Sequence, residues 1–355
     1  MMERDRLKVL MIGPDRSVHG GISGVVNNYY DAGLDRMVDL CYIGTMIEGS
    51  KWMKLLQAAK AYIRFLTKLP QYDIVHVNMA SDSSYYRKSV FIRTAKIYRK
   101  KIVIHQHGGN FPEFYAKELT GRGRERAIRT LSMGDILLVL GTTCREFFET
   151  IIDKDKITVL PNAIPISEQA AKQYGFHKIL FMGRMCKAKG VGELLAAMPE
   201  LCRRYPDVRL YLAGIWEDME LKTQISALGD CVRDLGWIGG ADKQRYLREC
   251  DIFVLPSYFE GQPVSVLEAM ANACGIVVSK TGDIPDMISD GETGLLIPPQ
   301  DAKALEEGLI SLLEQPELCR TLGENARRKA EAEFSIDNNV KRLLDVYESI
   351  SCREP

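Results

Sequence analysis

Short apolar runs alternate along the chain with longer stretches in which apolar residues recur three or four positions apart. The short runs are typical of buried strands and the longer stretches of amphipathic helices. In the first half the predicted strands are Leu7–Ile12, Leu40–Ile43, Asp73–Val77, Lys101–His105, Ile136–Leu140 and Thr158–Leu160. In the second half they are Lys178–Met182, Val208–Ala213, Val232–Leu235, Ile252–Leu255, Gly275–Ser279 and Gly294–Ile297. Because buried strands that alternate with helices form parallel sheets, the pattern predicts an α/β protein with two doubly wound, Rossmann-like sheets.

A chain of 355 residues is too long for one ordinary core and suits two domains. We expect an amino-terminal domain over residues 1–165, a carboxy-terminal domain over 166–336 and a last helix within 337–355. The segment 161–175, rich in proline, alanine and polar residues, is the predicted hinge. Ligands collect at the carboxyl ends of the strands in open α/β sheets. The pattern therefore predicts that the two sheets face each other across one cleft.

The segment FEGQPVSVLEAMA, residues 259–271, carries the clearest chemistry. It follows a buried strand, and Pro263 is predicted at the first position of a helix, where its missing N–H costs nothing. The amino end of a helix favours an anion through its unpaired N–H groups and its dipole. Glu260 precedes this helix and Glu268 lies within it. Two carboxylates at this spacing can accept hydrogen bonds from hydroxyl groups at opposite ends of one extended ligand, such as a ribose and a hexose joined by a diphosphate.

With seven residues between its glutamates, this segment resembles the E-x7-E signature of retaining glycosyltransferases of family 4, which have the GT-B fold. Five further elements, in the order of that family, support the resemblance: HGGISGVV at 19–26, HQHGG at 105–109, GRMCKAKG at 183–190, TGDIPDMI at 281–288 and DGETGLLIPP at 290–299. The resemblance covers nearly the whole chain. It also implies that the last helix crosses back to the first domain.

The resemblance implies a role for each matched position. Arg184 and Lys189 would hold the donor diphosphate, His107 would face the donor sugar, Glu260 would contact the sugar or support the reacting centre, and Glu268 would bind the ribose. Further diphosphate contacts are expected from the glycines of the first loop and from the start of the helix: Gly20, Gly21, Gly261, Gln262 and Val264. The base is expected near Ile238. Gln262 stands where the family more often has an apolar residue, so the resemblance does not predict the wall of the sugar pocket at this position.

No cofactor is expected, and because no acidic or histidine cluster apart from one D-x-D sequence has the spacing of metal ligands, we predict chemistry without a metal. Asp153 and Asp155 have the D-x-D form that binds metal in another glycosyltransferase fold, but they precede a predicted strand at its amino end, so we expect a loop cap. The nine cysteines are scattered singly, which favours reduced thiols over zinc sites or disulfides. No stretch approaches a membrane span, and the charged start MMERDRLKVLMIG does not have the form of a signal peptide. We expect a cytoplasmic protein.

The net charge of zero conceals an asymmetry between the two halves. Residues 1–170 hold 25 Lys and Arg against 18 Asp and Glu, an excess of +7, and the remainder carries −7. Residues 51–68 combine five basic residues with large apolar ones and no acid, which predicts a basic amphipathic helix able to lie on an anionic membrane. The run 87–101 adds to it. The alternative is a pair of solvated helices with their apolar faces in the core. Nucleic acid is not expected as a partner.

Together these features predict a retaining hexosyltransferase that moves a sugar from a UDP- or GDP-linked donor to a saccharide hydroxyl, with a lipid-linked acceptor in cell-surface polysaccharide or capsule synthesis. Three alternatives stay open: a sugar-nucleotide epimerase or phosphorylase with the same fold, a scaffold that binds nucleotide sugars without catalysis, and a glycosidase with Glu260 and Glu268 as its acid pair.

Overall fold

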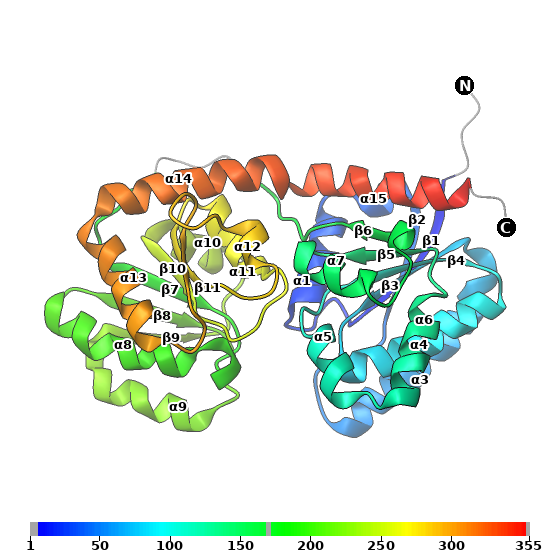
Figure 1. Ribbon diagram of the computed structural model, residues 1–355, viewed down its shortest axis with the longest axis horizontal. Coiled ribbons are helices and arrows are strands. Elements are labelled where there is room, and N and C mark those ends of the chain that lie inside the picture. Colours follow the sequence, from blue (N-terminus) through cyan, green and yellow to red (C-terminus); the bar gives the residue numbers. More distant parts are fainter. Residues whose placement is uncertain (1–5, 168–171, 353–355) are drawn as a thin grey trace. The chain divides into compact units, whose positions relative to one another are not determined.

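The computed structural model describes residues 6–167 and 172–352. Contacts within the chain divide it into two compact units (Figure 1). Unit 1 comprises Met1–Pro165 with Ile336–Pro355, and unit 2 comprises Ile166–Ser335. The predicted hinge, 161–175, includes residues 168–171, which lie outside the described residues.

The sheet of unit 1 has six parallel strands in the order β2-β1-β3-β4-β5-β6. The strands are β1 (Lys8–Gly13), β2 (Asp39–Gly44), β3 (Ile74–Met79), β4 (Lys101–Gln106), β5 (Ile136–Val139) and β6 (Ile157–Val159). All six positions of β3 are buried, as a strand covered on both faces requires. The chain order reverses between β1 and β3, which makes this point the topological switch point of the sheet.

Helices cover both faces of this sheet (Figure 1). They are α1 (Gly21–Asp31), α2 (Leu34–Met37), α3 (Lys51–Lys68), α4 (Asp82–Ile97), α5 (Phe111–Glu113), a π-helical turn (Phe114–Glu118), α6 (Gly121–Leu131), α7 (Thr142–Glu149) and α15 (Ile336–Ser351). On one face, alternate strand residues pack with aromatic side chains of α3, α4, α5 and α7 in one core. On the other face, Tyr347 of α15 lies against His76, with 2.6 Å between the phenol oxygen and Nδ1. The last helix therefore belongs to the core of unit 1.

Unit 2 has a second six-stranded parallel sheet, in the order β12-β11-β10-β7-β8-β9. Its strands are β7 (Lys178–Met182), β8 (Arg209–Ala213), β9 (Val232–Gly236), β10 (Ile252–Leu255), β11 (Gly275–Ser279) and β12 (Leu295–Ile297). Every residue of β10 and β11 is buried. Here the chain order reverses between β7 and β10.

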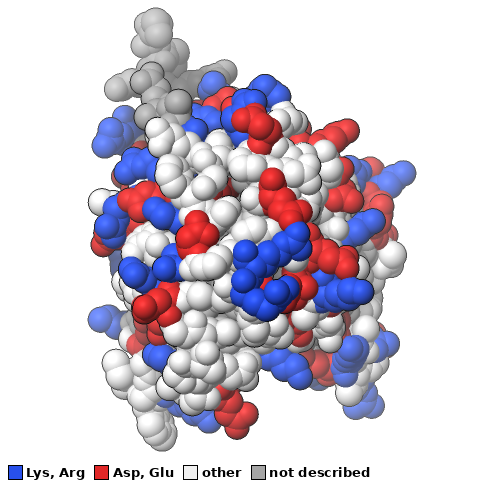
Figure 2. Space-filling view, turned by 90° about the vertical axis from the view of Figure 1, so that its left-hand side faces the viewer, with Lys and Arg blue, Asp and Glu red and all other residues white. Residues whose placement is uncertain are grey.

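Seven helices of unit 2 flank this sheet in the described part of the chain: α8 (Val191–Arg204), α9 (Met219–Gln224), α10 (Gly240–Glu249), α11 (Val264–Ala271), α12 (Ile284–Met287), α13 (Ala302–Glu314) and α14 (Pro316–Glu333). Arg204 of α8 forms an ion pair with Glu314 of α13. Figure 2, which views the molecule from the side where α8 and α13 lie, shows positive and negative side chains interspersed over this face. This face of unit 2 thus has no field of a single sign.

The structure confirms the predicted fold class and all twelve predicted strands, with ends that differ by at most two residues. The helix start at Pro263 is a correction. Pro263 has an extended ψ of 121° and precedes the helix, which begins at Val264. The proline still fits this place, because the carbonyl oxygen of Pro263 accepts the N–H of Val266 while its own nitrogen has no hydrogen to satisfy.

Candidate active site

The loops that follow three adjacent strands of unit 2 form one hydrogen-bonded layer. In the loop after β10, Tyr258 donates its backbone N–H to the carbonyl oxygen of Ala188, 2.9 Å away in the loop after β7. That loop also bonds to the loop after β8, because the N–H of Met185 donates to the carbonyl oxygen of Ile215 at 2.8 Å. The layer lies at the carboxyl ends of β10, β7 and β8, at the switch point of the sheet, which is where open α/β sheets bind ligands.

Glu260 and Lys189 meet in this layer. The Lys189 ammonium forms an ion pair with Oε1 of Glu260, and the Ser257 hydroxyl donates to the same oxygen at 2.7 Å. Only 18% of the Lys189 side chain and 10% of the Glu260 side chain are exposed. No described protein group donates to Oε2 of Glu260, so this oxygen is available to a ligand hydroxyl. The structure thus brings together two predicted site residues that lie 71 positions apart.

Two glycines make the close approach of these loops possible. Gly190 has φ +68°, and a Cβ atom there would lie 2.0 Å from the carbonyl oxygen of Pro256. Gly282 has φ +54°, and a Cβ atom there would lie 1.7 Å from the carbonyl oxygen of Glu260. Side chains at either position would push the Glu260 segment out of place, and both backbones adopt the left-handed conformation that glycine tolerates best. Two of the sequence elements that carry the resemblance therefore have a structural task at Glu260.

Arg184 lies at the start of the same loop but has a different partner. Its guanidinium Nη1 donates to Oε1 of Glu217 at 3.1 Å, and 60% of the Arg184 side chain is exposed. An exposed pair of this kind contributes little to stability. Arg184 can therefore exchange Glu217 for a phosphate without a large loss.

Glu268 lies on α11 and forms an ion pair with Lys243 of α10, at 2.5 Å between Nζ and Oε1. Because Lys243 is in the first turn of α10, the pair ties Glu268 to the segment before that helix, which contains the half-buried Ile238. Within the described residues, no hydrogen bond or ion pair joins Glu268 directly to Glu260.

The start of α11 holds the remaining predicted diphosphate contacts of unit 2. Gln262 is 5% exposed, whereas Gly261 and Val264 are partly exposed. With Pro263 as the residue before the helix, the first N–H groups of α11 are those of Val264 and Ser265, since the N–H of Val266 already donates to the carbonyl oxygen of Pro263. These groups have no partner within the helix and point toward the amino end, where an anion is favoured.

In unit 1, His107 follows β4 and contacts Asn78 at the end of β3. Its Nε2–H donates to Oδ1 of Asn78 at 2.8 Å, and the amide nitrogen of Asn78 donates to the carbonyl oxygen of Ile12 in β1 at 3.2 Å. This chain of hydrogen bonds fixes His107 at the switch point of the first sheet. Burial lowers the pKa of His107 to about 4, while a side-chain hydrogen bond with Asn162 acts in the opposite direction. His107 is therefore neutral at pH 7.

His107 stands at the end of a row of three histidines on one face of the sheet. Its ring centroid lies 3.9 Å from that of His105, which in turn lies 5.4 Å from that of His76. Burial lowers the pKa of His76 to about 3 and that of His105 well below its ordinary value, and the neighbouring rings add to both effects. His105 lies fully buried inside β4.

Gly20 and Gly21 lie in the loop that leads from β1 into α1. Gly20 is the residue before the helix, in an extended conformation with φ −174°. A Cβ atom at either glycine would meet no atom within 4 Å. Space around the backbone of both glycines is therefore open, and close approach of a ligand to this backbone stays the prediction for them.

Sequence reasoning missed the partners of the predicted residues. Ser257, Glu217, Lys243 and Asn78 each hold one predicted side chain in place. Only Ser257 had a local signal, because it lies three residues before Glu260 at the end of a strand. The others lie 25 to 33 positions from their partners, where the sequence shows no motif.

The acidic pair of the D-x-D sequence has the role predicted for it. The Asp153 carboxylate accepts the backbone N–H of Asp155 at 3.1 Å and caps the short 3₁₀ turn Lys154–Lys156 before β6. Within residues 6–167 and 172–352, no group of three or more His, Cys, Asp or Glu side chains is arranged to hold a metal ion.

Solved structures with the same two-sheet arrangement define the fold class. The structure superimposes on sucrose-phosphate synthase from Thermosynechococcus elongatus with a TM-score of 0.78 and 19% identity, over 97% of this chain and 99% of that chain. It superimposes on Anabaena HepE, solved in complex with UDP-glucose, with a TM-score of 0.77 and 17% identity, over 97% and 100% of the two chains. The protein has the GT-B fold, as predicted.

The sequence comparisons point to the same family as the motifs. Residues 164–329 match the family model described as "Glycosyl transferases group 1". A phosphatidyl-myo-inositol mannosyltransferase of Mycolicibacterium smegmatis is 31% identical over 176 residues, 49% of this chain and 45% of that protein. Spore coat protein SA of Bacillus subtilis is 31% identical over 196 residues, 51% and 52% of the two proteins. The chain spans about half the length of the curated relatives it matches. The predicted resemblance to a glycosyltransferase family is confirmed.

Proposed function

We propose that the protein is a retaining glycosyltransferase that moves a hexose from a nucleoside diphosphate sugar to a hydroxyl of a saccharide acceptor, without a metal ion. The observation that carries this proposal is the Lys189–Glu260 pair at the switch point of unit 2, beside the amino end of α11. This segment lies within the part of the chain that matches the glycosyltransferase family model. The superposition on HepE, solved with UDP-glucose, supports a donor of this class.

Each residue of the donor unit has a chemical task in this proposal. Lys189, Arg184 and the first N–H groups of α11 stabilise the negative charge that grows on the departing diphosphate. Arg184 and Lys189 each have hydrogen-bond donors left beyond the carboxylates that they contact. Oε2 of Glu260 accepts from a sugar hydroxyl, and Glu268 accepts from the ribose. The departing phosphate oxygen takes the proton of the acceptor hydroxyl, so no separate strong base is needed, and positioning supplies much of the rate.

We place the reaction at the cytoplasmic face of a membrane, with a lipid-linked acceptor. Within the described residues, no helix is long and apolar enough to cross a membrane. However, α3 buries only Ala61 and Phe65 of its 18 residues and exposes large apolar side chains, among them Trp52 at 75% and Leu56 at 68%. Its five basic residues and its lack of acids suit an anionic bilayer surface. In the second basic run Lys88 does not contribute, because it is fully buried and donates to the Thr45 hydroxyl at 2.6 Å.

A thermal-shift panel tests the donor site. The purified protein is heated with UDP, GDP, ADP and their sugar conjugates, with a chelator present, and the panel is repeated on Lys189→Ala. A ligand that binds only the folded state raises the apparent stability. We expect stabilisation by one nucleotide class that survives chelation and is lost in the variant. Stabilisation that needs an added divalent metal would contradict the metal-independent mechanism, and no shift with any nucleotide would contradict the assignment of the donor site.

A vesicle sedimentation assay tests the membrane contact separately. Phosphatidylcholine vesicles with 20 mol% phosphatidylglycerol are compared with vesicles of phosphatidylcholine alone. We expect binding to the anionic vesicles and its loss in Trp52→Ser/Leu56→Ser. Trp237→Ser, which removes an exposed tryptophan of unit 2, is the matched control. Equal binding of the α3 variant and the control would exclude α3 as the contact.

A further inference from the structure

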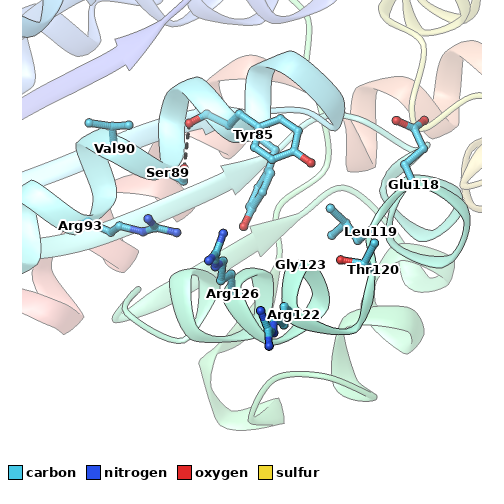
Figure 3. Close-up of a pocket in the computed structure, with 11 residues that line it drawn as sticks. Tyr85, Ser89, Val90, Arg93, Glu118, Leu119, Thr120, Arg122, Gly123 and Arg126 are labelled. Atoms are coloured by element: carbon cyan, nitrogen blue, oxygen red, sulfur yellow. Dashed lines mark hydrogen bonds between the residues drawn. The ribbon is translucent and has the colours of Figure 1, made fainter.

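Unit 1 contains a pocket that none of the predicted site residues line. It has a volume of about 660 Å³ and lies between α4 and the segment 118–126, which includes the start of α6 (Figure 3). Cavities of this size hold small-molecule ligands in many proteins. Because three arginines line it, Arg93, Arg122 and Arg126, we call it the arginine pocket.

The positive charge of the arginine pocket is not neutralised by the protein. None of its three guanidinium groups has a carboxylate within ion-pair distance among the described residues, and the only hydrogen bond of Arg93 is to the Thr130 hydroxyl at 3.1 Å. The neighbouring Arg124 behaves differently, since it donates to the backbone carbonyl oxygens of Tyr115 and Ala116 and so has a structural task. Unpaired guanidinium groups around one cavity favour a phosphate, which they bind through two parallel hydrogen bonds.

The chemistry of the pocket changes from one end to the other. In Figure 3, Arg93 and Arg126 lie toward one end and Glu118 at the opposite end. Glu118 lies beside Asp82, the first residue of α4, directly after β3 and hence at the carboxyl edge of the sheet. Arg93 is eleven residues farther along α4, about 16 Å at 1.5 Å per residue. Carboxylates suit sugar hydroxyls, so the pocket fits a molecule with a saccharide toward the edge of the sheet and a phosphate farther along α4.

The phosphate end opens beside apolar surface. Tyr86 and Val90 line the pocket and are 57% and 46% exposed, and Ile97, on the same side of α4, is 78% exposed. These residues are spaced by four and seven positions, so they form one stripe along the helix. The neighbouring α3 adds its own exposed apolar side chains. A phosphate that carries a hydrocarbon chain can therefore lie in the pocket while its chain continues along α4.

We propose that the arginine pocket binds the phosphate or diphosphate group of a lipid-linked saccharide acceptor, an inference that rests on the proposed glycosyltransferase function. Arg93, Arg122 and Arg126 contact the phosphate oxygens, and the chain leaves past Val90. Glu118 and Asp82 receive hydroxyl groups of the saccharide at the carboxyl edge of the sheet. The pocket thus selects an acceptor by its phosphate and holds its saccharide near the residues that follow β3 and β4.

Calorimetric titration of the full-length protein with farnesyl diphosphate tests this assignment. UDP, or the nucleotide that the thermal-shift panel selects, is present at saturation so that the diphosphate site of unit 2 is filled. We compare Arg126→Gln with Arg129→Gln, which removes an exposed arginine of the same helix that does not line the pocket. We expect Arg126→Gln to weaken farnesyl diphosphate binding about tenfold, Arg122→Gln/Arg126→Gln to weaken it further, and Arg129→Gln to change it less than twofold. Nucleotide affinity stays unchanged in all three variants.

The titrations decide whether the arginine pocket binds a lipid-linked phosphate. Equal affinities of Arg126→Gln and Arg129→Gln, or no binding of farnesyl diphosphate to the wild-type protein, would overturn the proposal. Inorganic pyrophosphate, titrated in the same way, separates the sources of the phosphate: if it binds as tightly as farnesyl diphosphate, the lipid-linked source is wrong. If the wild-type protein binds no nucleotide, the proposed function is contradicted. The affinities of Arg126→Gln and Arg129→Gln for farnesyl diphosphate would still test the arginine pocket in that case.

Discussion

The two units keep the charges of their candidate sites in opposite states. In unit 2 each cation of the site forms an ion pair with a glutamate. This holds for the two predicted cations, Lys189 and Arg184, and for Lys243, the partner of Glu268. In unit 1 the arginine pocket holds three cations that have no carboxylate partner among the residues the structure describes, and the site residue His107 is neutral. The cations of the site in unit 2 are therefore paired with carboxylates before a ligand binds, whereas the arginine pocket in unit 1 has an excess of positive charge.

This difference has a consequence for binding. A diphosphate that enters the site of unit 2 competes with Glu260 for Lys189 and with Glu217 for Arg184. Part of its binding energy therefore only replaces ion pairs that the free protein already contains. In return, the cations are held in position before the ligand arrives, which lowers the entropy that binding must overcome. An anion that enters the arginine pocket displaces no carboxylate. Positioning is the advantage of the first arrangement and charge the advantage of the second.

The comparison is tested most strongly at Lys189. If this ammonium stabilises charge on the departing diphosphate, Lys189→Ala lowers turnover by roughly 10²–10³-fold, the loss typical of one transition-state donor. The removal also leaves the largely buried carboxylate of Glu260 with Ser257 as its remaining partner among the described residues, so we expect a loss of stability of about 1–3 kcal/mol. Steady-state release of nucleotide from the donor and urea unfolding measure the two effects.

Lys187→Ala is the matched control, because Lys187 lies in the same 3₁₀ turn, Lys187–Lys189, and is exposed without an acidic partner in the described part of the chain. We expect nearly wild-type turnover and stability. Turnover that falls equally in both variants would show that the loop carries general positive charge instead of one positioned donor.

The second test addresses the backbone that brings Lys189 to Glu260. Gly190→Ala places a Cβ atom on the carbonyl oxygen of Pro256 in a left-handed conformation, and we expect a loss of roughly 2–4 kcal/mol in the free energy of unfolding together with weaker nucleotide binding. Gly192→Ala is the control: its Cβ would lie 3.6 Å from Leu221, an ordinary contact, and alanine favours the helix. A stable Gly190→Ala protein would mean that the two loops can separate without cost.

How far the sequence predicts this molecule depends on how local each signal is. The twelve strands were predictable because buried strands have continuous runs of apolar residues in the sequence, such as those that contain Val75, Val77 and Ile104. Glu260, Lys189 and Gly190 were predictable because each lies in a short motif directly after a strand. In the first sheet, the sequence singled out His107 but gave no sign of its partner Asn78, which comes from another strand.

The arginine pocket was not predictable for the same reason. Arg93 and Arg126 come from two helices, 33 positions apart, and nothing in either helical pattern shows that they line one cavity. Even the charge excess of the first 170 residues misled in part, since it counted the fully buried Lys88 with the surface cations. A count of charges does not show which of them are paired or buried.

The third test concerns the neutral histidines of unit 1. Their folded-state pKa values lie below the unfolded value of about 6.5, so the unfolded state binds more protons as the pH falls, and the stability present above pH 6.5 is lost toward pH 4. From pH 7 to pH 5 each such histidine lowers the stability by roughly 2 kcal/mol. Hydrogen exchange should show this loss in peptides of β3 and β4. His105→Leu removes one titrating group and should reduce the pH dependence by one histidine's share; an unchanged slope would exclude His105 as a contributor.

The smallest expected effect distinguishes Glu268 from its partner Lys243. If Glu268 accepts hydrogen bonds from the ribose, Glu268→Ala lowers nucleotide affinity about tenfold, or about 1.4 kcal/mol, within the range for hydrogen bonds to a charged group. Lys243→Ala should leave the affinity unchanged or raise it slightly, because it frees Oε1 of Glu268 from the competing ammonium. Calorimetric titration with the selected nucleotide measures both variants. If Lys243→Ala instead weakens binding as much as Glu268→Ala does, the ion pair acts as a unit that shapes the pocket, and Glu268 does not contact the ribose on its own.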